Sequence, residues 1–149
     1  MRSLRSSALV LGVALVLAPA IGGCSKAKPA DGAAAKAADV PVMSIDEVAV
    51  RLASGTCRVV DANGAQLRKD VGVIPNAVLL SDYESYSLKE LPEDKTTPLV
   101  FYCANEQCDA SHVAARRARS AGYERVHVLA VGILGWAKAG RSVDKSAIL

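Results

Sequence analysis

The chain has 149 residues, which leaves room for one domain of ordinary size behind a leader. Its formal charge of +3 arises before Val40, since basic and acidic side chains balance from there onward. With one Trp, one Phe and no basic stripe interleaved with aromatic residues, the sequence gives no reason to expect nucleic acid as a partner.

Residues 1–23 are predicted to form a secretory signal peptide. Arg2 and Arg5 give it a positive start, an apolar stretch follows, and small residues stand before Cys24. The apolar stretch is shorter than the roughly 20 residues that a membrane span needs. The end of the segment resembles a bacterial lipobox, whose cysteine is acylated and becomes the first residue of the mature protein. An ordinary leader or anchor with an incidental cysteine is the alternative.

The lipobox resemblance implies that Cys24 is the lipid attachment, which holds the chain to a membrane of the bacterial cell envelope. Ser25 follows the cysteine, and because no Asp stands there we expect the periplasmic face of the outer membrane. Residues 24–39 are small and polar, carry lysines and lack a hydrophobic period. We therefore expect a flexible tether over 24–39 and a folded domain over 40–149.

The folded domain begins with a predicted helix and strand. Ser44 and Glu47 match a capping box, and apolar residues at helical spacing follow until Ser54 and Gly55 end the helix. The run Cys57–Asp61 then predicts a buried strand with an acidic residue at its carboxyl end.

The middle of the domain is less regular. The polar residues 62–70 show no hydrophobic period and are expected to be irregular. From Gly72 a proline-containing turn leads into another apolar run, and residues 83–91 favour a helix. Residues 92–98 form a charged connection to the central strand.

Strands and helices alternate in the second half of the domain. Leu99–Tyr102 predicts a buried strand, and alanines at helical spacing from Ala110 predict a helix that stops at Gly122. Val126–Leu129 is the last predicted strand and Gly132–Ala139 the last helix. This alternation favours an α/β fold in which a parallel sheet carries helices on both faces.

Two residues stand at the carboxyl ends of predicted strands, where functional groups gather in parallel sheets. They are Cys103, which follows the central strand, and Asp61, which ends the first. Cys103 is either a buried, inert cysteine or a nucleophile, and Asp61 either caps a turn or takes part in a site. The N-terminus of the next helix favours a thiolate at Cys103, whereas Glu106 and Asp109 in the same loop oppose it.

A second cysteine, Cys108, lies in the same loop. It is a resolving thiol for Cys103, its disulfide partner, or a small loop residue, and only a curved loop brings the α-carbons within the roughly 4.4–6.8 Å that a disulfide needs. Cys57, at the start of a strand, is expected in the core. The spacing of Cys103, Cys108 and His112 invites a zinc or copper hypothesis, but a fourth ligand is not apparent and we predict no metal.

Five motifs resemble, in their order and spacing, the rhodanese family of sulfurtransferase domains. Between residues 40 and 140 they are VVDAN, GVIPNAVLL, LVFYC, AAxxAxxxGY and VHVLxxGILGW. The resemblance implies a three-layer fold around a mostly parallel sheet of about five strands. It also implies that Cys103 accepts a sulfane sulfur as a persulfide, in a loop whose backbone N–H groups point at the sulfur. No cofactor is expected.

The cysteine loop departs from the family pattern. The family loop commonly runs Cys-x-x-Gly-x-Arg and then Ser, whereas here Cys108 stands at the Arg position, no Gly is present and Ser111 comes two residues late. Asn63 replaces another family Arg, and Val73 replaces a family His. Because the loop Arg helps to hold an anionic sulfur donor, we expect poor turnover of thiosulfate.

We therefore predict a membrane-anchored domain that transfers sulfur or exchanges thiol for disulfide through Cys103, with Cys108 as its partner. Its partners are a small sulfur donor or a thiol-bearing protein, besides the membrane that the lipid enters. The other loop residues are candidates for substrate binding: Ala104, Asn105, Glu106, Gln107 and Asp109. The alternative is a catalytically inactive rhodanese-like binding module at the envelope, which the missing loop Arg, turn His and loop Gly favour.

Overall fold

The computed structural model describes residues 40–146. The predicted signal peptide, the lipidation residue Cys24 and the tether lie outside the described residues. In the part described, no helix is both long enough and apolar enough to cross a membrane. The elements in chain order are α1 (Ile45–Ala53), β1 (Arg58–Asp61), α2 (Ala65–Val71), β2 (Val78–Leu79), η1 (Leu88–Glu90), β3 (Leu99–Tyr102), α3 (Ala110–Ser120), β4 (Val126–Leu129) and α4 (Gly132–Lys138).

Four strands form one parallel sheet in the order β2-β1-β3-β4. The central strands β1 and β3 are in a register that pairs Asp61 with Tyr102. Ahead of α1, Val42 forms a parallel bridge with Val128 of β4 and adds one short pairing at that edge. The predicted α/β fold with a mostly parallel sheet of about five strands is confirmed.

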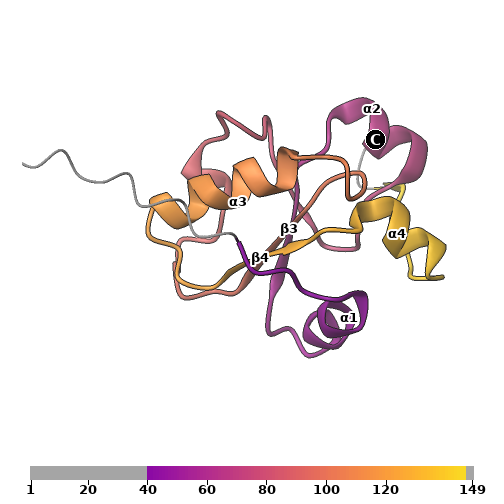
Figure 1. The fold of residues 1–149 in the computed structure, drawn as a ribbon, viewed down its shortest axis with the longest axis horizontal. Coiled ribbons are helices and arrows are strands. Elements are labelled where there is room, and N and C mark those ends of the chain that lie inside the picture. The colour runs from indigo at the N-terminus through magenta and orange to yellow at the C-terminus, as the bar shows by residue number, and fades with distance from the viewer. Residues whose placement is uncertain (1–39, 147–149) are drawn as a thin grey trace, which may run out of the picture. The chain divides into compact units, whose positions relative to one another are not determined.

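Helices cover both faces of the sheet (Figure 1). One core cluster joins the buried alanines of α3 to Val60 and Phe101, and a second joins Val48 of α1 and Ile133 of α4 to Val100. Successive residues of β3 belong to alternate clusters, as expected for a strand that is buried on both faces. Figure 1 shows α3 and α1 on opposite sides of the strands.

Most of the predicted elements are present. The capping box of α1 forms as predicted: the Ser44 hydroxyl accepts from the N–H of Glu47, and the Glu47 carboxylate accepts from the N–H of Ser44. The strands β3 and β4 have the predicted bounds.

The prediction of an irregular stretch over 62–70 is wrong, because α2 begins within it. The one buried residue of α2 is charged, Arg68, and the N-cap residue of the helix, Gly64, makes no side-chain bond. The helix therefore shows neither the apolar period nor the cap by which a helix is recognised in a sequence. Within 83–91, only the single 3-10 turn η1 is helical.

Candidate active site

The loop 103–109 connects β3 to α3 at the edge of the sheet where the strands end. Tyr102 and Asp61 are register partners, so Cys103 follows β3 beside the end of β1. The predicted positions of Cys103 and Asp61 at the carboxyl ends of strands are confirmed, and the two strands are neighbours. The loop is also bonded to α4, because the N–H groups of Ile133 and Leu134 donate to the carbonyl oxygens of Cys103 (2.9 Å) and Ala104 (3.1 Å).

Gly132 allows α4 to approach the loop this closely. Its φ is +60°, a left-handed conformation that favours glycine. A Cβ at this position would lie 2.4 Å from the carbonyl oxygen of Ala104 and 2.5 Å from that of Cys103. Any side chain here would therefore displace the loop.

The Cys103 thiol is buried and surrounded by acceptor oxygens. The residue is 1% exposed. Its Sγ donates to the carbonyl oxygen of Cys108 at 2.8 Å, the Ser111 hydroxyl lies 3.3 Å from the sulfur, and the Asn105 carbonyl oxygen lies 4.0 Å away. The family resemblance implied a loop of N–H groups aimed at the sulfur, whereas two carbonyl groups of this loop turn toward it.

These surroundings favour the protonated thiol. Burial raises the pKa of Cys103 above its usual range, and the Cys108 side chain raises it further. The hydroxyl and the N–H of Ser111, in the first turn of α3, act in the opposite direction. The N-terminus of the helix was expected to favour a thiolate at Cys103. Burial has the larger effect and raises the pKa of the thiol.

Cys108 is partly exposed and, like Cys103, a free thiol. The loop curves, because the N–H of Cys108 donates to the Asn105 carbonyl oxygen at 3.1 Å and the N–H of Gln107 donates to Asn105 Oδ1 at 3.0 Å. The Cys108 carbonyl oxygen accepts from the Cys103 thiol at 2.8 Å, and the Cys108 side chain lies close enough to raise the pKa of Cys103. The two thiols that the sequence placed in one loop are therefore neighbours in space.

The remaining loop residues differ in exposure. Ala104 and Asn105 are half-buried, whereas Glu106, Gln107 and Asp109 are exposed. Asp109 occupies the N-cap position of α3, but its side chain makes no capping bond. Ser111 lies inside the helix with its hydroxyl against the Cys103 sulfur.

Asp61 is fully buried, and its carboxylate is held by several donors. The Tyr102 hydroxyl donates to Oδ2 at 2.7 Å, and the N–H of Asn63 donates to Oδ1 at 2.6 Å. The Tyr102 oxygen in turn accepts from the N–H of Ile74 at 3.0 Å. These contacts lock the residue before Cys103 in place, and a chemical role for Asp61 stays a prediction.

Arg68 is part of this network and was missed by the sequence analysis. Its Nε lies 3.4 Å from Asp61 Oδ1, and its Nη2 donates to the carbonyl oxygens of Asp61 (3.0 Å) and Leu80 (2.9 Å). The sequence did contain a signal for Arg68. A buried Asp61 needs a cation nearby, and Asn63 stands where the family has an Arg. Arg68 is the next basic residue along the chain.

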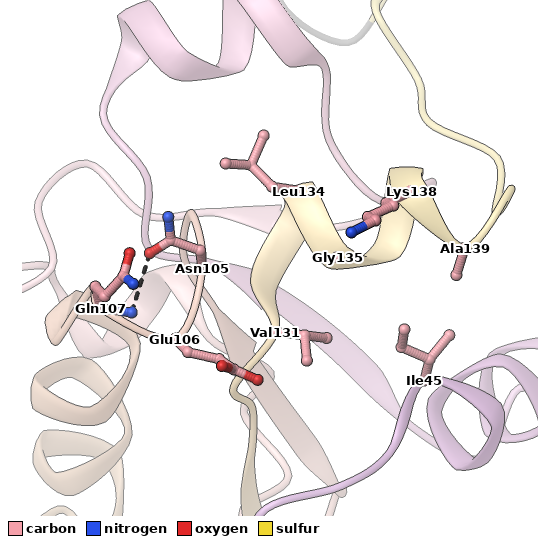
Figure 2. A pocket seen from close by; sticks show the side chains of 9 residues that line it. All are labelled: Ile45, Asn105, Glu106, Gln107, Val131, Leu134, Gly135, Lys138 and Ala139. Carbon is pink, nitrogen blue, oxygen red and sulfur yellow. Dashed lines mark hydrogen bonds between the residues drawn. The ribbon is translucent and has the colours of Figure 1, made fainter.

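A pocket of about 530 Å³ lies between the loop and α4. Figure 2 shows Asn105, Glu106 and Gln107 on one side of it and the α4 residues Leu134 and Lys138 on the other. Apolar side chains, among them Ile45 and Val131, complete the lining. Glu106 and Lys138 give this lining one acidic and one basic group.

No group of three His, Cys, Asp or Glu side chains in residues 40–146 is arranged to hold a metal ion. The combination of Cys103, Cys108 and His112 is thus not such a group in this structure.

A parallel α/β sheet whose central strand ends in a cysteine loop defines a class of thiol-bearing domains. The sequence model of the rhodanese-like domain matches residues 44–139, so the chain belongs to the rhodanese-like domain family. The family that the sequence resembled is confirmed. A comparison with curated proteins gave no match.

Solved structures share the fold at low sequence identity. A Bacillus halodurans protein has a TM-score of 0.62 at 23% identity, covering 73% of this chain and 81% of that chain. The rhodanese-like domain of an Anabaena protein has a TM-score of 0.58 at 21% identity, with coverages of 73% and 83%. A human single-domain sulfurtransferase has a TM-score of 0.55 at 23% identity, with coverages of 66% and 96%.

Proposed function

We propose that this domain carries sulfane sulfur, or exchanges thiol for disulfide, through Cys103, with Cys108 as the resolving thiol. The observation that carries the proposal is the pair of neighbouring free thiols in the loop after β3, one buried and one partly exposed. Membership of the rhodanese-like family and the similarity in fold to a sulfurtransferase support sulfur chemistry at this loop.

The sulfur-transfer step starts with a persulfide donor. The Cys103 thiolate attacks the outer sulfur of the donor, the sulfur–sulfur bond of the donor breaks, and the rest of the donor leaves as a thiolate that takes up a proton. Cys103 then carries the sulfur as a persulfide. The Cys108 thiolate attacks Sγ of Cys103, hydrogen sulfide leaves, and a disulfide forms that an external thiol reduces.

Mass spectrometry of the full chain tests this chemistry. After incubation with a persulfide donor, we expect a mass increase of one sulfur atom, located on the peptide that contains Cys103. The Cys108→Ser variant should retain this sulfur longer, because the step that releases it is lost. The Cys57→Ser variant is the control, since Cys57 is buried in the opposite core cluster. If neither added sulfur nor a Cys103–Cys108 disulfide formed under any redox condition, the proposal would be rejected.

We further propose that the chain is held in the bacterial envelope by a lipid on Cys24, at the periplasmic face of the outer membrane. The lipobox-like ending of residues 1–23 supports this location. Labelled palmitate should enter the wild-type protein and be absent from the Cys24→Ser variant. Incorporation into the variant would contradict the anchor.

A catalytically inactive binding module is the second candidate. The observation that favours it is the Cys103 thiol itself, which is buried and donates to the Cys108 carbonyl oxygen instead of facing an open pocket. In this case Cys103→Ser should leave both the cellular phenotype and the recovery of partner proteins intact. Loss of both on that single change would exclude the inactive module.

A further inference from the structure

The groups that face the Cys103 sulfur are suited to a hydrogen-bond donor, not to an anion. The carbonyl oxygens of Cys108 and Asn105 lie 2.8 Å and 4.0 Å from Sγ. Ser111 contributes a hydroxyl at 3.3 Å, and this hydroxyl and the Ser111 N–H both lower the pKa of Cys103. A carbonyl oxygen carries partial negative charge, so an oxyanion brought to this sulfur would be repelled by two of its nearest neighbours.

The charged side chains around the loop add to this repulsion. The loop itself contains two carboxylates and no basic residue, and both carboxylates, Glu106 and Asp109, are exposed. The exposed segment after β2 adds Glu84 and Asp82, which, together with Cys108, raise the pKa of Tyr83. Exposed carboxylates are thus carried both by the loop and by the segment after β2.

Basic side chains near the loop do not offset these carboxylates. Arg117 of α3 is held at the segment after β2, where it donates to the Tyr86 carbonyl oxygen at 3.2 Å and lies 5.2 Å from the centre of the Tyr86 ring. Lys138 lies across the pocket from the loop, on the side opposite Glu106. The loop itself therefore has two exposed carboxylates and no basic residue beside the two thiols.

We infer that the sulfur substrate of this loop carries a positive charge beside its reactive sulfur, as in an aminothiol disulfide or persulfide, and that oxyanionic donors are selected against. This inference rests on the proposed thiol chemistry. In the exchange step, a cysteine thiolate attacks one sulfur of the substrate disulfide, a mixed disulfide forms, and the other half leaves as a thiolate that takes up a proton. The cysteine is oxidised and the leaving sulfur is reduced.

Three probe disulfides of different charge test the inference on the full chain. They are cystamine (dication), bis(2-hydroxyethyl) disulfide (neutral) and 3,3′-dithiodipropionate (dianion). Each rate of mixed-disulfide formation at Cys103 or Cys108 is divided by the rate of the same probe with 1-thioglycerol, a neutral thiol that none of the probes contains, which removes the intrinsic reactivity of the probe. We expect the normalised rate of the dication to exceed that of the dianion about tenfold at low salt, and the ratio to shrink as salt is added.

A pair of double variants assigns the effect to the loop. Glu106→Gln with Asp109→Asn should reduce the dication-to-dianion ratio several-fold. Glu93→Gln with Glu124→Gln changes the net charge equally at the edge where β3 and β4 begin, and should leave the ratio unchanged. Equal normalised rates for all three probes would overturn the charge inference and leave the thiol chemistry standing. Failure of both cysteines to react with the neutral probe would overturn both.

The cation belongs either to a protein segment or to a small aminothiol, and a further experiment with a peptide probe distinguishes the two. The probe is a lysine-flanked cysteine peptide supplied as its mixed disulfide with 2-mercaptoethanol. A normalised rate above that of cystamine indicates a protein segment, and a rate at or below it indicates a small aminothiol.

Discussion

Ser111 is the residue that opposes the rise in the pKa of Cys103. Its hydroxyl lies 3.3 Å from the sulfur, and both this hydroxyl and the N–H of Ser111 lower a pKa that burial raises. When the thiol loses its proton, the hydroxyl can reverse its direction and donate to the thiolate. Ser111 thus acts as a positioning residue that keeps a buried nucleophile usable.

We predict that Ser111→Ala raises the pKa of Cys103 further and slows its alkylation at neutral pH about tenfold, the effect of one hydrogen bond to a charged group. Because the wild-type pKa is already raised, the midpoint of the rate against pH should lie above that of the same cysteine in urea. The measurement is the rate of iodoacetamide labelling of the Cys103 peptide. Ser120→Ala, at the exposed end of α3, is the control. Identical pH profiles for Ser111→Ala and wild type would contradict the role of Ser111.

At the scale of the elements, the start of α4 and the loop 103–109 form one unit. Two N–H groups of α4 bond to the first two carbonyl groups of the loop, and Gly132 leaves no space between them. Movement of α4 must therefore reach the backbone that carries Cys103.

We expect Gly132→Ala to displace the loop. The variant combines a left-handed alanine with a Cβ 2.4 Å from a carbonyl oxygen, so it should destabilise the fold by about 3 kcal/mol and expose Cys103 to alkylation. Gly140→Ala is a matched control, because Gly140 also has a positive φ (+72°) but nothing within 4 Å of the added Cβ. It should cost about 1 kcal/mol and leave labelling unchanged. Urea unfolding and Cys103 labelling measure both effects, and similar results for the two variants would refute the close-approach argument.

The buried ion pair of Arg68 and Asp61 fastens α2 to β1. We predict that Arg68→Met lowers the free energy of unfolding by about 3 kcal/mol, near the lower end for breaking a buried pair, because Asp61 keeps its bonds from Tyr102 and Asn63. Lys69→Met, one residue along the same helix and exposed, should change stability by less than about 0.5 kcal/mol. Denaturant titration compares the two, and equal losses would show that the ion pair contributes nothing.

These elements also show what the sequence could and could not predict. The capping box at Ser44, the apolar strand Leu99–Tyr102 and the alanine face of α3 are local signals, and each predicted its element. The buried Arg68 gave no signal in the local pattern, and only the need of a buried Asp61 for a cation pointed to it, because its partners Asp61 and Leu80 become neighbours only when β1, β2 and α2 pack together. The sequence likewise identified the loop thiols but not the direction of the carbonyl groups around Cys103, which depends on how the loop curves.

At the scale of the whole molecule, the parallel strands give the domain two unlike edges. The chain enters beside β4, where the Pro41 carbonyl oxygen accepts from the N–H of Val128 and the N–H of Met43 donates to the Val128 carbonyl oxygen. Because this pairing is parallel, Val40 lies toward the edge where β4 begins. Cys103 follows the end of β3, at the other edge.

We predict that a folded fusion partner placed directly before Val40, in place of residues 1–39, leaves the reaction of Cys103 and Cys108 with a neutral disulfide unchanged. The added bulk joins the edge where the strands begin, away from the loop. Rates for the fusion and for the mature protein are compared by mass spectrometry at equal concentration. A slower reaction of the fusion would contradict this separation of the two edges.

The bridge between Val42 and Val128 therefore determines where a segment attached ahead of Val40 joins the domain. We therefore expect that a segment ahead of Val40 can be lengthened or exchanged without blocking the loop. The same domain is suited to a lipid, a spacer or a second folded module as its support.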